Sequence, residues 1–140
     1  MRELTLEARV KNLQLVLSFL EGILEENGCP LKKKMQIDIA VEEVFVNVAR
    51  YAYSSGTGVV QICVEPLEAG VEIVVRDQGM PYDPLKTKVP DITLPSDKRP
   101  IGGLGVFMMK KIMDEARYEY REGWNVLTMR VSWQKSRGNG

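Results

Sequence analysis

The chain has 140 residues, which corresponds to one domain with enough length to bury a core. Nineteen Lys and Arg residues balance nineteen Asp and Glu residues, so the net charge indicates neither a nucleic-acid partner nor a membrane surface. No apolar run approaches the roughly 20 residues of a transmembrane helix, and no signal peptide is evident, so we expect a cytoplasmic protein. The absence of His excludes Ser-His-Asp triads, His-containing zinc sites and a phosphohistidine on this chain.

Hydrophobic periodicity predicts one strand and two helices in the first third of the chain. Apolar and polar residues alternate over residues 3–9, as in a short amphipathic strand. Apolar residues then recur every three or four positions over 13–26, which predicts a helix with Asn12 as its cap and a stop at residues 27–30. A second helical pattern runs from about residue 32 to residue 53.

After the second helix the apolar period changes from about 3.6 to 2, which predicts strands. Residues 60–65 and 71–77 alternate in this way, and residues 68–70 form a turn between them, so the two strands make an antiparallel hairpin. From residue 77 to residue 105 the pattern fails and prolines are frequent. A loop of this length inside a compact domain is functional or disordered.

The last third predicts a helix over 104–115 and a closing hairpin with strands 117–121 and 125–134. Residues 135–140 read as a polar, frayed tail, so residues 1–140 form a single domain. Because the strands are joined mainly as hairpins and the helices form separate runs, the fold class is α+β. We expect a two-layer sandwich whose mixed, mostly antiparallel sheet is covered by helices on one face.

Glu43 and Asn47 are four residues apart on the second predicted helix, so their side chains lie on one face of it. A carboxylate can accept a proton or orient a nucleophile, and an amide oxygen is a suitable Mg²⁺ ligand. The pair therefore suits a phosphate-bearing substrate. The alternative is a solvated helix face.

Asp77 falls on the same strand face as the apolar residues before it, and a carboxylate at the end of a core-facing row needs a partner. At the rim of a pocket it would accept a hydrogen bond from the exocyclic amine of a base such as adenine. Alternatively it caps the turn that begins at Gln78 and Gly79, as Asp before Gly often does. The sequence leaves both interpretations open.

A glycine-rich turn, Ile101–Gly105, immediately precedes the last predicted helix. Backbone N–H groups and the helix N-terminus would both face an anion there, an arrangement that can bind phosphate, although such a turn is more often only structural. The turn matches neither a Walker A motif nor a dinucleotide-binding fingerprint. Lys98 and Arg99 stand just before it and could meet a terminal phosphate.

Together these segments resemble the motifs of the GHKL ATP-binding superfamily, in the same order. Glu42–Asn47 resembles its N box, Asp77–Pro81 its D-x-G box and Gly102–Gly105 its G-x-G box. Within the superfamily, residues 48–53 and 99–106 are similar to the stand-alone anti-sigma factor serine/threonine-protein kinases. The resemblance extends from the first strand to Trp133.

This resemblance implies a Bergerat-type sandwich that binds Mg²⁺-ATP between its helices and a lid. It implies that Glu43 is the catalytic carboxylate and that Asn47 is the Mg²⁺ ligand. Asp77 would contact adenine, Gly79 would let the backbone approach the base, and Gly103 and Gly105 would shape the lid hinge. The ATP-binding residues that it implies are Asn47, Arg50, Asp77, Gly79, Pro81, Arg99, Gly102, Gly103, Leu104 and Gly105.

The implied function is a kinase of a partner-switching system. Such kinases phosphorylate a serine of an anti-sigma-factor antagonist, a STAS-type protein, and otherwise hold a sigma factor, usually as homodimers. The alternative is a nucleotide-responsive module that binds its partner without phosphotransfer. A sensor histidine kinase domain is disfavoured, because the chain has no His and no preceding pair of dimerisation helices.

Overall fold

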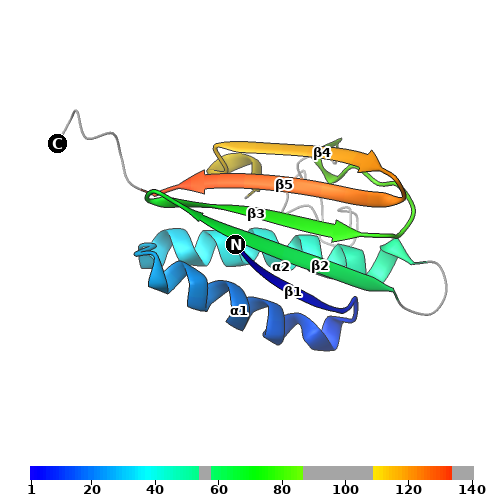
Figure 1. Cartoon of the computed structure of the whole chain (residues 1–140), viewed down its shortest axis with the longest axis horizontal. Coiled ribbons are helices and arrows are strands. Elements are labelled where there is room, and N and C mark those ends of the chain that lie inside the picture. Colours follow the sequence, from blue (N-terminus) through cyan, green and yellow to red (C-terminus); the bar gives the residue numbers. More distant parts are fainter. Residues whose placement is uncertain (54–57, 87–108, 134–140) are drawn as a thin grey trace, which may run out of the picture.

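The computed structural model of the chain describes residues 1–53, 58–86 and 109–133. Five strands and two long helices make up most of this part (Figure 1). The elements in chain order are β1 (Arg2–Glu7), the 3₁₀ turn η1 (Val10–Asn12), α1 (Leu13–Glu26), α2 (Leu31–Asn47), the π-helical turn η2 (Val48–Ala52), β2 (Val59–Leu67), β3 (Gly70–Asp77), the 3₁₀ turn η3 (Pro84–Lys86), β4 (Glu115–Arg121) and β5 (Trp124–Ser132).

The strands form one sheet in the order β1-β2-β3-β5-β4, and every strand pair in the described residues is antiparallel. Helices α1 and α2 lie side by side on one face of this sheet (Figure 1). The α+β fold class and the two-layer arrangement are therefore confirmed. The sheet has no parallel pair in this part of the chain, so it is more regular than the mixed sheet that we expected.

The core lies between the sheet and the two helices. Alternation puts Ile62, Val75 and Leu127 on the helix-facing side of neighbouring strands, where the register pairs Ile62 with Val75 and Val75 with Leu127. Each fully buried side chain of this size contributes roughly 1.5–3 kcal/mol relative to exposure. Helix α1 adds four such side chains, Val16, Leu20, Ile23 and Leu24.

Helix α1 ends where glycine permits a left-handed residue. Gly28 has a φ of 77°, its N–H donates to Glu25 O at 3.2 Å, and Cys29 N–H donates to Leu24 O at 3.0 Å. These two hydrogen bonds make a Schellman motif, which satisfies carbonyls at the end of the helix. At the other end Asn12 occupies the cap position as predicted, but its amide donates to Glu7 O and does not cap the helix.

The second predicted helix is divided in the structure. The α-helical part of α2 ends at Asn47, and η2 continues the chain as one π-helical turn. The carbonyl of Ala52, in that turn, accepts a hydrogen bond from Met80 N–H at 3.0 Å. A π-helical turn of this kind is often found at functional sites, because it changes the direction of the following residues.

Both predicted hairpins are present, each with a two-residue turn. Ala69 takes a φ of 53° in the β2–β3 turn, whereas Gly70 is the first residue of β3. A Cβ on Gly70 would lie 2.7 Å from Val131 O, so glycine is needed there for close approach to β5. In the β4–β5 turn Glu122 and Gly123 have φ values of 53° and 87°, the signs that a type I′ turn requires.

The last predicted helix is partly seen. Residues 109–112 are helical, but Glu115, which we expected to end this helix, is the first residue of β4. The chain leaves the helix early because Asp114 N–H donates to Arg130 O at 2.8 Å, and this bond starts the β4–β5 pairing. The glycine-rich turn (residues 101–105), Lys98 and Arg99 before it, and the tail (135–140) lie outside the described residues.

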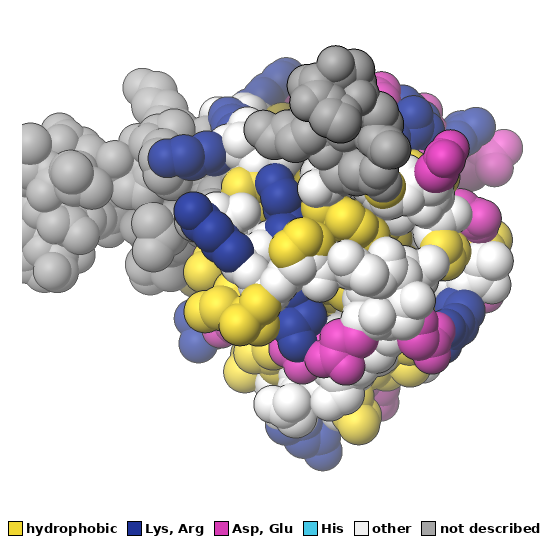
Figure 2. Space-filling model, turned by 90° about the vertical axis from the view of Figure 1, so that its left-hand side faces the viewer, with side chains coloured by type: hydrophobic (Ala, Val, Ile, Leu, Met, Phe, Trp, Pro, Cys, Tyr) yellow, Lys and Arg dark blue, Asp and Glu magenta, His cyan; other side chains and the backbone are white. Residues whose placement is uncertain are grey.

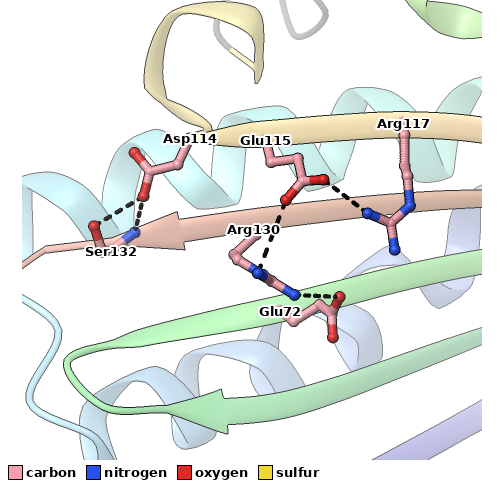
Figure 3. A network of polar contacts seen from close by, with 6 residues as sticks. All are labelled: Glu72, Asp114, Glu115, Arg117, Arg130 and Ser132. Atoms are coloured by element: carbon pink, nitrogen blue, oxygen red, sulfur yellow. Dashed lines mark hydrogen bonds and ion pairs between the residues drawn. The ribbon is translucent and has the colours of Figure 1, made fainter.

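The other face of the sheet bears no helix in the described part of the chain, and it carries charged side chains (Figure 3). Arg130 on β5 lies between Glu72 on β3, at 3.4 Å, and Glu115 on β4, at 3.8 Å. Such exposed ion pairs contribute little individually to stability. Within residues 1–53, 58–86 and 109–133, no helix is long and apolar enough to cross a membrane.

Candidate functional site

A cavity of about 270 Å³ opens where η2 meets the ends of β3 and β5. Its walls are mainly apolar, which suits the flat faces of a planar ligand, and a few polar groups converge on it. Asp77 is the buried acidic residue of this cavity and Asn125 is its buried amide. The lining residues are Val44, Asn47, Val48, Tyr51, Ala52, Val75, Asp77, Met80, Pro81, Tyr82, Pro84, Tyr118, Asn125 and Leu127.

Asp77 ends β3 on the helix-facing side, 5% exposed, as the strand alternation predicts. Its Oδ1 accepts hydrogen bonds from Gly79 N–H at 2.8 Å and from Asn125 Nδ2 at 2.9 Å. Oδ2 receives no hydrogen bond from the described residues, so it can accept one from a ligand. The turn-capping interpretation of Asp77 therefore holds at Oδ1, whereas the contact with a base stays a prediction for Oδ2.

Burial raises the pKa of Asp77 above its usual range. The hydrogen bonds from Gly79 and Asn125 act in the opposite direction, because both stabilise the ionised carboxylate. These two donors therefore keep a buried carboxylate available as an acceptor. A ligand group that donates hydrogen bonds, such as an exocyclic amine, matches the available oxygen.

Asn125 is held in one orientation by the groups around it. Its Oδ1 accepts from Tyr118 OH in a short hydrogen bond and from Tyr82 N–H at 3.1 Å. Its Nδ2 donates to Asp77 and, at 3.0 Å, to Met80 O. Because donors face one end of the amide and acceptors face the other, a flipped amide would lose these bonds.

The turn after Asp77 packs against η2. A Cβ on Gly79 would lie 2.2 Å from Ala52 O, so only glycine permits this contact. Tyr53 holds the same junction from the side, because its OH donates to Val59 O at 2.6 Å and accepts from Gln78 N–H at 2.8 Å. In the structure the need for glycine at Gly79 thus arises from the helix end, in addition to the approach to a base that the resemblance implies.

The structure brings some of the predicted site residues to the cavity. Asn47, Asp77 and Pro81 line it, and Gly79 contacts Asp77 directly. Glu43 lies one helical turn before Asn47 and is half-buried, but it is not among the lining residues, and neither is the exposed Arg50. The remaining predicted residues lie outside the described part of the chain, namely Arg99, Gly102, Gly103, Leu104 and Gly105.

Sequence reasoning missed three polar residues of the site, Tyr53, Tyr118 and Asn125. A signal was present for Asn125, because it stands on the core-facing row of β5 with Leu127. The parity argument that singled out Asp77 therefore applies equally to Asn125. The two tyrosines carried no such signal, since their hydroxyl groups bond to segments 25 and 7 residues away.

The residues present fit a nucleotide with a divalent cation. Apolar walls with one carboxylate oxygen at the end suit a purine base that bears an amino group. Mg²⁺ usually keeps several waters and substrate oxygens as ligands, so it needs few protein groups. The amide of Asn47 on the cavity wall provides one oxygen of the appropriate type.

A second hollow, of about 500 Å³, lies at the end of the molecule where α2 begins and β5 ends. Figure 2 views that end, and Lys and Arg side chains gather there beside hydrophobic ones. Among its lining residues are Lys33, Lys111 and Asp114. Asp114 already accepts hydrogen bonds from Ser132 N–H and Oγ at 2.9 and 2.8 Å (Figure 3). The cavity beside Asp77 is therefore the better candidate site.

Comparison with known proteins agrees with this fold. A family described as the histidine kinase-like ATPase domain matches residues 6–131, and the chain therefore belongs to that family of ATP-binding domains. It is similar to the serine-protein kinase RsbW of Bacillus cereus (strain AH187), with 27% identity over 129 residues, 89% of this chain and 81% of that protein. The corresponding protein of Bacillus thuringiensis (strain Al Hakam) is 28% identical over the same length.

A solved structure shows the same fold at greater distance. The Acinetobacter baumannii histidine kinase AdeS superimposes with a TM-score of 0.50 and 16% sequence identity. The match covers 96% of this chain and 70% of that one. At this identity the likeness concerns the fold alone.

Proposed function

We propose that this protein is a cytoplasmic protein serine/threonine kinase of a partner-switching system. In this proposal it uses Mg²⁺-ATP to phosphorylate an anti-sigma-factor antagonist of the STAS type and, as a homodimer, binds a sigma factor. One observation carries the proposal: in a chain of the ATPase family, Asp77 presents an available carboxylate oxygen to an apolar cavity beside Asn47. The similarity to proteins named serine-protein kinase supports the choice of serine as acceptor.

Asp77 and the apolar walls would select the base of the nucleotide. The Asp77 oxygen that the described residues leave without a donor accepts hydrogen bonds, and adenine offers its exocyclic amine. Asn125 cannot offer a further donor to the base, because its amide hydrogens are directed to Asp77 and to the carbonyls of Gly79 and Met80. The cavity therefore favours a base that donates at this position.

Glu43 and Asn47 would act at the phosphate end. A serine hydroxyl of the partner attacks the γ-phosphorus, its proton passes to the Glu43 carboxylate, and the bond to the ADP oxygen breaks. Asn47 would hold Mg²⁺, which when bound neutralises charge on the phosphate oxygens. Positioning and charge neutralisation of this kind account for most of the catalysis in phosphoryl transfer.

The test is phosphate transfer from labelled ATP to a purified STAS-type antagonist, with Glu43→Gln and the exposed neighbour Glu42→Gln as matched variants. Glu43→Gln should lower transfer at least 100-fold and change ATP affinity less than about threefold, because general-base catalysis contributes roughly 10²–10⁴-fold. Glu42→Gln should transfer at the wild-type rate. Undiminished transfer by Glu43→Gln would remove Glu43 from this role.

A second function is favoured by one observation, the position of Glu43 outside the lining of the cavity. If Glu43 stays away from the nucleotide, the protein would bind its partner in response to nucleotide without transferring phosphate. Such a protein would leave the antagonist unlabelled in the same assay while still retaining a sigma factor in a nucleotide-dependent complex. Labelled antagonist would exclude this alternative.

A further inference from the structure

The sheet ends at β4 on the side away from β1, and β4 is an exposed edge strand (Figure 1). Within residues 1–53, 58–86 and 109–133, no other segment forms a backbone hydrogen bond with the side of β4 that faces away from β5. Five of its seven side chains are exposed, and it contains neither proline nor lysine, two residues that commonly protect an edge. This outer edge of β4 therefore presents backbone groups with which another strand can pair.

The turn of the β4–β5 hairpin determines which backbone groups lie at that outer edge. Arg121 pairs with Trp124 across a two-residue type I′ turn, so these two residues form a hydrogen-bonded pair. Hydrogen-bonded and non-hydrogen-bonded pairs alternate along an antiparallel ladder. The N–H and C=O groups that point away from β5 consequently belong to Ala116, Tyr118 and Tyr120.

Charges of alternating sign follow the helix-free face of β4. The row consists of the residues at every second position, Glu115, Arg117, Glu119 and Arg121. Figure 3 shows the first two of them on that face. Along the strand, Arg117 pairs with Glu115 and Arg121 pairs with Glu119, each at 2.7 Å. Since the four side chains are 47–66% exposed, they remain accessible to a second row of charges.

This row is complementary to itself when the strand is reversed. If two copies of β4 pair antiparallel about a two-fold axis at Tyr118, Arg117 lies opposite Glu119 of the second copy. Glu115 then lies opposite Arg121 of the second copy. These are non-hydrogen-bonded positions, where side chains approach most closely, and the three outward-facing residues pair with one another. An axis at Arg117 or at Glu119 would instead place like charges opposite each other, so charge selects the register.

The helix-facing row of β4 fits the same register. Tyr120, 46% exposed, lies opposite Ala116 of the second copy, so a large side chain meets a small one. Tyr118 lies at the axis, and its OH donates to Asn125 in the cavity beside Asp77. Each cavity would therefore lie one side chain away from the second copy.

The other edge strand, β1, lacks this complementarity. Leu4 and Leu6 pair with core residues of β2, so the helix-free face of β1 carries Glu3, Thr5 and Glu7. The ionisable groups of the strand on that face are all acidic. Two β1 strands would thus oppose like charges, or a charge and a threonine, and they gain no ion pair. Charge distinguishes β4 from β1 as the edge that can pair with itself.

We propose that β4 pairs with β4 of a second copy of this chain, antiparallel about Tyr118, and joins the two five-stranded sheets into one. The axis is perpendicular to the sheet, so the helices of both copies lie on the same face. The inference rests on the proposed function only in assigning a surface to its homodimer. It requires neither ATP nor phosphotransfer, so the interface and the kinase activity can fail separately.

The test exchanges charges across the interface, with self-association of the whole chain measured by analytical ultracentrifugation. Arg117→Glu places two acidic groups opposite each other, and Glu119→Arg places two basic groups there. Each variant alone should dimerise about tenfold or more weakly than the wild type, because two attractive pairs become repulsive. In an equimolar mixture with one variant fluorescently labelled, a hybrid dimer should form with wild-type affinity, since every pair again joins opposite charges.

Glu3→Arg on β1 is the matched control and should dimerise as the wild type does. Because exposed ion pairs contribute little to stability, Arg117→Glu and Glu119→Arg should fold. If either does not, Glu115→Arg and Arg121→Glu repeat the exchange at the other pair.

Three outcomes would overturn the β4 interface. The first is a folded wild type that stays monomeric at about 1 mM. The second is unchanged dimerisation of Arg117→Glu or Glu119→Arg, and the third is a mixture of the two that forms no hybrid. Phosphotransfer by a monomeric wild type would remove the interface and leave the kinase activity in place.

Discussion

The two oxygen atoms of Asp77 have different surroundings. Oδ1 accepts hydrogen bonds from the backbone of Gly79 and from the amide of Asn125. Oδ2 receives no hydrogen bond from the described residues, so a ligand can donate to it. Tyr118 and Tyr82 in turn fix the orientation of Asn125. The carboxylate at the end of the cavity is therefore positioned before any ligand arrives, which reduces the cost of ordering it on binding.

Replacing Asn125 by Leu should weaken nucleotide binding and alter its pH dependence. Leu keeps a similar volume but removes the partner that Asn125 provides to Asp77, Tyr118 OH and Tyr82 N–H. Each of these groups that stays without a hydrogen bond destabilises the site by roughly 1–3 kcal/mol. Because the Asn125 amide lowers the pKa of Asp77, its loss raises that pKa further. In calorimetric titrations from pH 5 to 8 we expect ATP affinity to fall at least tenfold. We also expect the loss of affinity on acidification to begin at a higher pH than in the wild type.

The matched control for this variant is Thr128→Val on the same strand, on the face without helices. It should bind ATP as the wild type does at every pH. An Asn125→Leu protein with wild-type affinity and an unshifted acid limb would show that Asn125 does not position Asp77.

At the scale of elements, the β2–β3 turn shows how glycine and positive φ can be separated. The sequence predicts a turn at residues 68–70 and gives its only glycine at Gly70. In the structure Ala69 adopts the left-handed conformation, and Gly70 makes room for Val131 O. The position of the turn can thus be predicted from the local sequence. Which of its residues takes the left-handed conformation depends on β5, about 60 residues further along the chain.

Two substitutions at this turn should have opposite effects on stability. The left-handed conformation of Ala69 costs the folded state roughly 1–2 kcal/mol, and Ala69→Gly removes this cost. Because glycine also gives the unfolded chain more conformational freedom, we expect the free energy of unfolding to rise by only about 0.5 kcal/mol. Gly70→Ala puts a Cβ 2.7 Å from Val131 O, and strand displacement should cost about 1–3 kcal/mol. Urea unfolding of the two variants beside the wild type measures both. A stabilising Gly70→Ala would contradict the close approach to β5.

The helices and strands of this chain were largely predictable from local patterns. The bounds of α1 agree with the prediction, because its apolar stripe is followed by a glycine and a proline, and both residues end helices. The division of the second helix at Asn47 was not predicted, since it depends on the hydrogen bond between Ala52 and Met80. The early end of the last helix likewise depends on Arg130, which belongs to a different strand.

At the scale of the whole molecule, the alternation of apolar and polar residues predicts one part of the site, and contacts between distant segments form the rest. Residue parity predicts Asp77 on the core face, and the structure brings Asn47 from α2 to the same cavity. The sheet order places β5 beside β3, so that Asn125 stands opposite Asp77. No local pattern specifies that strand order, so the pairing of Asn125 with Asp77 could not be predicted, although parity already put Asn125 on the core face of its strand.

The central claim is that the cavity beside Asp77 binds Mg²⁺-ATP, and Asp77→Asn tests it. Gly79 N–H and Asn125 Nδ2 both need an acceptor, so the oxygen of the new amide must face them. The amide nitrogen then takes the position of Oδ2 and opposes the exocyclic amine of adenine, donor against donor. The loss should be about 2 kcal/mol or more, which corresponds to roughly 30-fold in Kd.

The most direct measurement is therefore a calorimetric titration of the wild type, Asp77→Asn and the remote control Asp114→Asn with ATP and Mg²⁺. The wild type and the control should show the same saturable binding, and Asp77→Asn should bind at least 30-fold more weakly while remaining folded. A folded wild type that does not bind ATP, or an Asp77→Asn protein that binds it equally well, would contradict the assignment of this cavity.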